Sequence, residues 1–82
     1  MAVKYLDVRS LVPPDPFLTI VQSLVELEPG QILKVHHRRQ PFPLFDRLAD
    51  MGFEYGCHSD GEDGFYIEIW HSRESYHIAD TV

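Results

Sequence analysis

Apolar residues recur at two spacings along the chain, and these spacings predict the order of its elements. Alternation of apolar and polar positions is typical of a half-buried strand, and spacings of three and four are typical of a helix. The alternating pattern covers residues 3–8, 31–37, 53–58 and 65–71. The helical pattern covers residues 15–27 and a shorter stretch from Pro41 to Gly52. The predicted order is therefore β-α-β-α-β-β.

Prolines and glycines mark the ends of both predicted helices. Asp15 is a plausible N-cap, and Pro16 suits the first helical position because its missing N–H would have no partner there. Pro29 and Gly30 end this helix. Its predicted inward face comprises Phe17, Ile20, Val21, Leu24 and Leu27. The inward face of the second helix comprises Leu44, Phe45, Leu48 and Met51.

These elements predict an α/β fold of the two-layer α+β sandwich type. Two helices cannot cover both faces of four strands, so we expect a mixed four-stranded sheet with both helices on one face. Right-handed crossovers make the first strand pairings parallel. The polar, glycine-bearing loop 59–64 predicts an antiparallel hairpin at the end. We expect a single domain over residues 1–82, with a core over 3–71 and a polar tail, 72–82, that frays or packs loosely.

Charge and composition narrow the class of protein. The 82-residue chain has a net charge of −6 with its five histidines neutral. That balance argues against broad binding to nucleic acid and against binding to an anionic membrane surface. There is no apolar run long enough to cross a bilayer, and the N-terminus carries no signal-peptide pattern. The single cysteine, Cys57, excludes an internal disulfide. Together these features predict a cytoplasmic protein, and we expect no cofactor.

The predicted element order is accompanied by three short segments, Leu6-Asp7-Val8, Pro14-Asp15-Pro16 and Glu28-Pro29-Gly30-Gln31. Together they resemble the TusA/SirA-like domains, which are small sulfur carriers and their relatives. The family motif is Cys-Pro-x-Pro at the start of the first helix. Pro14 and Pro16 match its two prolines, and Pro13 stands where the cysteine would be. A persulfide carrier needs a thiolate, which proline lacks, so this chain cannot carry sulfur at that position.

The stretch 37–44 resembles a branch of the TusA-like group whose function is unknown. Members of that branch often lack the cysteine and are fused to, or encoded beside, hemerythrin-like and nitrogen-oxide-related proteins. The resemblance covers about residues 4–71. It implies the same two-layer fold and a place in redox or nitrogen-oxide metabolism.

A basic segment on this acidic chain predicts an anion-binding site. If the first two strands are parallel, their carboxyl ends bring Arg9 and the loop carrying His37, Arg38 and Arg39 to one edge, where both helix N-termini also point. Guanidinium groups match carboxylates, phosphates and sulfur oxyanions bidentately. In the alternative interpretation these arginines are solvated or pair with acidic residues, namely Asp7, Asp15 and Asp46. The prolines near both helix starts also reduce the number of backbone N–H donors.

The histidines and the cysteine support a weaker alternative. His36 and His37 are neighbours on a strand and face opposite ways, but His58 and His71 flank the last hairpin and could approach across it. Hydrogen-bonded or solvent-facing histidines are the alternative to a metal site, and a metal shared at a dimer interface stays open. Cys57 lies on an apolar face, which favours a buried structural cysteine over a displaced sulfur carrier.

The face of the sheet without helices is a candidate partner surface. It is expected to carry Tyr66 and Trp70, together with Tyr5, Ile32 and His36; exposed aromatic patches often mark protein interfaces. Alternatively, the tail with Tyr76 and Ile78 folds over it. No catalytic arrangement is recognisable. The sequence therefore favours a non-enzymatic module that binds a small anion or a protein partner, a second copy included. The alternative is a sulfur-carrier or metal-binding redox accessory protein using Cys57 or the histidines.

Overall fold

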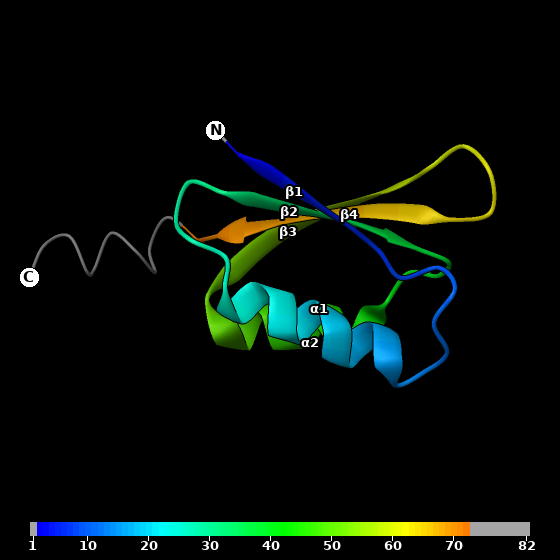
Figure 1. The fold of residues 1–82 in the computed structure, drawn as a ribbon, viewed down its shortest axis with the longest axis horizontal. Coiled ribbons are helices and arrows are strands. Elements are labelled where there is room, and N and C mark those ends of the chain that lie inside the picture. Colours follow the sequence, from blue (N-terminus) through cyan, green and yellow to red (C-terminus); the bar gives the residue numbers. More distant parts are fainter. Residues whose placement is uncertain (1, 73–82) are drawn as a thin grey trace, which may run out of the picture.

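The computed structural model describes residues 2–72 and contains the six predicted elements in the predicted order. They are β1 (Val3–Asp7), α1 (Asp15–Val25), β2 (Ile32–His37), α2 (Phe42–Met51), β3 (Phe53–Ser59) and β4 (Phe65–His71). Figure 1 shows both helices packed on one face of the four-stranded sheet, which confirms the two-layer arrangement. The expectations for tail residues beyond Ser72, including the cover by Tyr76 and Ile78, lie outside the described residues.

The sheet order is β1-β2-β4-β3, and one strand pairing differs from expectation. β1 and β2 are parallel, as predicted, but the second crossover does not bring β3 beside β2. Instead β4 inserts between them and pairs antiparallel with both. The burial of the strands explains this order. Ile67 and Ile69 of β4 are fully buried, whereas β3 exposes most of its residues and therefore suits an edge of the sheet.

The core lies between the sheet and the helices. Ile20 and Leu24 of α1 and Leu44 and Leu48 of α2 point into it, as the helical spacing predicts. From the sheet it receives alternate residues of the two central strands, namely Leu33, Val35, Ile67 and Ile69. These side chains are almost completely excluded from solvent, and burial of this apolar surface is the main source of stability for the fold.

The ends of α1 differ from the predicted ones. The helix begins at Asp15 after Pro14, so Asp15 is its first residue and not its N-cap, and the cap position makes no side-chain hydrogen bond. The carboxylate of Asp15 still complements the positive end of the helix. α1 ends at Val25, and the N–H of Leu27 bonds to the carbonyl of Leu24 at 3.1 Å. This tighter turn is typical of helix C-termini, and it keeps Leu27 in the core.

The topology brings four chain segments to one end of the molecule. β1 and β2 both end there, and both helices begin there, as Figure 1 shows. The carboxyl ends of parallel strands and the starts of the following helices are the usual place for a ligand in such folds. In the described part of the chain, neither helix is long and apolar enough to cross a membrane.

Candidate anion-binding site

Arg9 follows β1 and is already occupied by a neighbouring carboxylate. Its Nη2 lies 2.7 Å from Oδ2 of Asp7 and its Nε lies 3.0 Å from Oδ1, so the pair is bidentate. The N–H of Arg9 also donates to Oδ1 of Asp7 at 3.0 Å. These bonds hold the pKa of the Asp7 carboxyl well below its usual range. For Arg9 the alternative interpretation is therefore right, because its charge is neutralised within the chain.

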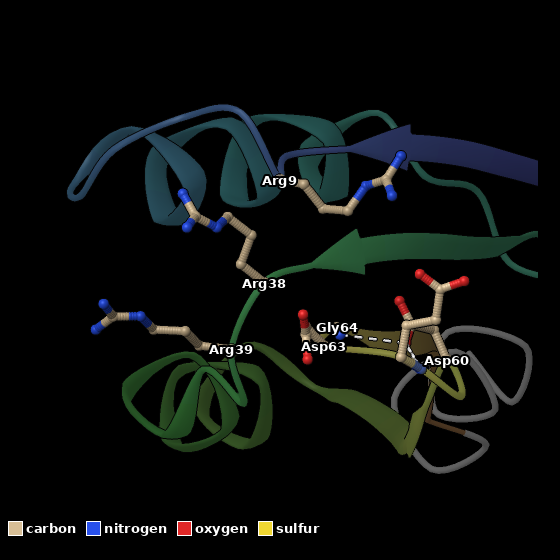
Figure 2. A pocket seen from close by; sticks show the side chains of 7 residues that line it. Arg9, Arg38, Arg39, Asp60, Asp63 and Gly64 are labelled. Atoms are coloured by element: carbon tan, nitrogen blue, oxygen red, sulfur yellow. Dashed lines mark hydrogen bonds between the residues drawn. The ribbon is translucent and has the colours of Figure 1, made fainter.

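Arg38 and Arg39 follow β2, are exposed, and form no ion pair within residues 2–72. With Arg9 they line an open hollow of about 230 Å³, whose other wall is the β3–β4 loop. That wall carries three carboxylates, of Asp60, Glu62 and Asp63. In the view of Figure 2, the guanidinium groups of Arg38 and Arg39 extend away from Asp60 and Asp63, toward the helices. Because these carboxylates would repel an anion, Arg38 and Arg39 can bind an anion only on the side that faces the helices.

On the helix side, Arg38 and Arg39 line a second hollow, of about 160 Å³. The loop between β1 and α1 and the first turn of α1 form its apolar wall through five residues, namely Val8, Leu11, Val12, Pro13 and Pro16. His37 completes the lining. The structure thus brings together three of the four predicted anion-binding residues, and it places two of the three motif prolines against them. Among residues 2–72, no acidic side chain lines this hollow.

The ring of His37 has a defined proton arrangement. The backbone N–H of Arg39 donates to Nδ1 of His37 at 3.1 Å, so Nδ1 is the acceptor and the proton of the neutral ring lies on Nε2. Burial and the nearby charge of Arg39 both lower the pKa of His37. At neutral pH the ring is therefore uncharged and presents an N–H donor at Nε2.

The helix N-termini contribute fewer donors than their position suggests. Both helices carry a proline in the first turn, which removes an N–H. Several of the nearby amides are also used: the N–H of Asp15 donates to the carbonyl of Val12 at 2.9 Å, and that of Leu44 donates to the carbonyl of Pro41 at 2.9 Å. The donors for an anion are therefore mainly the side chains of Arg38, Arg39 and His37.

A hydrogen-bonded cluster on the other side of the sheet was not predicted. Nε2 of His36 lies 2.7 Å from Oδ2 of Asp60, and both side chains are largely buried. Oδ1 of Asp60 accepts the N–H groups of Glu62 at 2.7 Å and Gly64 at 3.1 Å. These bonds, that of His36 foremost, lower the pKa of Asp60. The cluster fixes the β3–β4 loop against the end of β2. His36 and Asp60 are 24 positions apart in the sequence, and no local pattern in the chain predicted that they would meet.

The two weak metal candidates lie apart. His71 pairs with Phe53 at the start of β3, whereas His58 pairs with Tyr66 near the loop, so they occupy opposite ends of the hairpin. The prediction that they approach each other is therefore wrong. Nε2 of His71 instead lies 2.6 Å from the carbonyl oxygen of Leu27. Within residues 2–72 there is no cluster of three or more His, Cys, Asp or Glu side chains suited to a metal ion.

Cys57 is half-buried and packs against the core on the helix side of β3. Burial raises the pKa of its thiol, which lowers the fraction of reactive thiolate at neutral pH. Within the described residues, the surroundings of Cys57 thus contain no feature that activates its thiol. A sulfur-carrying role for Cys57 finds no support in its surroundings.

The predicted partner surface lies on the uncovered face of the sheet, but part of it is engaged. The ring of His36 stacks on Tyr66 with 4.2 Å between centroids, and the ammonium group of Lys34 lies 4.7 Å from the same ring. Tyr5 is 76% exposed, whereas Trp70 is half-buried. Binding of a protein partner to this face stays a prediction.

The fold and the site together define a small two-layer α+β domain with an arginine-bearing hollow at the carboxyl ends of its parallel strands. The chain belongs to the DUF2249 family of uncharacterized conserved proteins, whose match covers residues 5–71. That range contains all six elements apart from the first two residues of β1, and it contains every residue of the hollow. The comparisons with curated proteins and with solved structures gave no match.

Proposed function

We propose that this domain is a non-enzymatic module that binds a small anion at Arg38, Arg39 and His37. The observation that carries the proposal is the absence of any carboxylate partner for two adjacent exposed arginines within residues 2–72. The chain has 13 acidic residues against seven Lys and Arg, so carboxylates are plentiful elsewhere. Two guanidinium groups and the Nε2–H of His37 offer the donors that a carboxylate, phosphate or sulfur oxyanion accepts.

The position of Pro13 supports binding over covalent transfer. Pro13 lines the hollow beside Arg38 and Arg39, where the TusA-like resemblance would place a nucleophilic cysteine. Proline offers no nucleophile, so residue 13 would form no covalent bond to a ligand in this hollow, and hydrogen bonds would hold the ligand. We extend the proposal to a role in redox or nitrogen-oxide metabolism on the strength of the resemblance alone.

The test is a titration of the isotope-labelled protein with sulfate, followed by NMR at constant ionic strength set with chloride. We expect amide shifts confined to the hollow, because a bound anion changes the environment of the residues around it. In the double variant Arg38→Gln with Arg39→Gln, we expect sulfate affinity to fall at least about ten-fold, since hydrogen bonds to charged groups contribute about 1.5–3 kcal/mol.

A matched control separates this site from the overall charge of the domain. Lys4→Gln with Arg47→Gln also removes two positive charges, and both residues are exposed and lie outside the hollow. We expect this control to bind sulfate as the unmodified protein does. Equal weakening in both double variants, or no sulfate-specific shift in the unmodified protein, would overturn the proposal.

A further inference from the structure

The hollow of about 160 Å³ that Arg38 and Arg39 line continues into an apolar hollow that the proposed function does not explain. This apolar hollow has a volume of about 200 Å³ and shares Pro13, Pro16 and His37 with the arginine-lined hollow. Its remaining lining is apolar and comes from the starts of both helices: Pro14, Phe17, Pro41, Pro43 and Leu44. We call the two joined hollows the proline groove. One of its ends carries two guanidinium groups, and the other carries no charged side chain from the described part of the chain.

The prolines make the apolar part of the groove suited to an apolar ligand segment. A proline has no N–H that burial would leave without a partner, so covering it with an apolar group leaves no donor unsatisfied. Its fixed backbone angle also reduces the conformational freedom that binding would have to remove. An inorganic anion would touch only the arginine end and would leave these walls unused.

His37 lies where the two parts of the groove meet. It lines both hollows, and its Nδ1 is already bonded to the N–H of Arg39. Within residues 2–72, every buried side-chain nitrogen or oxygen has a hydrogen-bond partner. Nε2 of the half-buried His37 has no such partner among these residues, so this atom is not buried and is open to solvent. Nε2–H can therefore donate to a ligand oxygen at the boundary between the charged and the apolar part.

We propose that the ligand is an amphiphilic monocarboxylate, with its carboxylate at Arg38 and Arg39 and its short hydrocarbon chain along the proline groove. This inference rests on the proposed function and adds the chemical class of the ligand. The complementarity is of charge at one end and of apolar surface at the other. If the part of the ligand beside the prolines were doubly charged or strongly hydrated, it would lose its bound water there without gaining hydrogen bonds from the protein.

The test is a series of straight-chain carboxylates, namely acetate, butyrate, hexanoate and octanoate, titrated below their aggregation concentrations. Complete burial of one methylene contributes about 0.8 kcal/mol, which is about a four-fold gain in affinity. The groove is open, so we expect affinity to rise about two- to four-fold per methylene and to level off once the groove is filled. Sulfate and hexanol supply the two controls, because one has the charge without the chain and the other has the chain without the charge.

Val12→Ser tests the apolar wall. Val12 is 66% exposed and lines the groove next to the arginines, so its replacement should reduce the gain in affinity per methylene. Val25→Ser is the matched control, because Val25 is 77% exposed at the end of α1 and does not line the groove. Amide spectra of both variants verify that they are folded.

The outcomes separate this inference from the proposed function. Sulfate and acetate binding with no gain from longer chains would overturn the inference and leave the anion site standing. Hexanol binding as tightly as hexanoate, with no effect of the arginine double variant, would overturn both. A gain per methylene that Val12→Ser reduces and Val25→Ser leaves intact is the result we expect.

Discussion

Replacement of Gly64 by alanine should destabilise the domain far more than the same replacement at Gly56. A β-carbon at Gly64 would lie 2.6 Å from Oδ2 of Asp60 and 2.9 Å from the carbonyl oxygen of His37. Neither neighbour can move freely. His37 ends a central strand paired on both sides, and Asp60 accepts the N–H groups described above. At Gly56 the Trp70 ring, at 4.0 Å, is the only contact that a β-carbon would make with residues 2–72, and that distance is an ordinary van der Waals contact.

The size of the difference follows from these contacts. Forcing an atom into a filled space costs about 1–3 kcal/mol. At Gly56, whose φ is not positive, alanine should stabilise the fold by about 0.4–1 kcal/mol, because it restricts the unfolded chain. The two variants should therefore differ by about 1.5–4 kcal/mol. That is a large fraction of the total, since a domain of this size is stable by about 4–12 kcal/mol.

Urea denaturation monitored by circular dichroism measures the stability of both variants. It does not depend on the fluorescence of Trp70, whose ring lies beside Gly56. We expect the urea midpoint of Gly64→Ala to fall below that of the unmodified protein and that of Gly56→Ala to equal or exceed it. A separation of about 1 M urea is consistent with the energies above. Equal midpoints for the two variants would refute the reasoning, because they would show that the β3–β4 loop is not fixed against β2.

Two further predictions concern protonation and thiol chemistry. Burial and Arg39 lower the pKa of His37, so the unfolded chain binds more protons below about pH 6.5, and stability that is present above that pH should be lost on acidification. The lowered pKa values of Asp7 and Asp60 add a second loss below about pH 4. His37→Asn should flatten the first step in urea midpoints between about pH 7.5 and about pH 5.5, and an unchanged slope would contradict this account. Because burial raises the pKa of Cys57, iodoacetamide should alkylate the folded protein at least about ten-fold more slowly than the urea-unfolded chain. Equal rates by mass spectrometry would favour the sulfur-carrier alternative.

The element order could be predicted because the apolar spacing in each segment is decided locally. Alternation along 65–71 places Ile67 and Ile69 on the face opposite Tyr66 and Trp70, and both isoleucines are fully buried. The strand order could not be predicted in the same way, because the spacing in β3 and β4 does not say which of them lies beside β2. Comparing their polarity would have favoured β4, since β3 has more polar positions.

The candidate site was predictable where it depends on the parallel pairing of β1 and β2. That pairing brings the ends of the strands together, and it places His37, Arg38 and Arg39 beside Pro13 and Pro16. The sequence did not show that Arg9 differs from Arg38 and Arg39. Its partner Asp7 is only two residues away, but the geometry of the structure was needed to show that the two side chains pair. The His36–Asp60 pair depends on β4 lying beside β2, and the separation of His58 from His71 depends on hairpin register, so neither followed from local pattern.

The most direct test of the anion site observes the arginine side chains themselves. NMR resolves the Nε–H signals of individual arginines, which can be assigned by substitution. On addition of sulfate at constant ionic strength, the account predicts saturable shifts for Arg38 and Arg39. It predicts none for Arg9, which is held by Asp7, or for Arg47, which lies outside the hollow. Shifts of equal size at these four arginines, or no shift at Arg38 and Arg39, would contradict the proposed anion site.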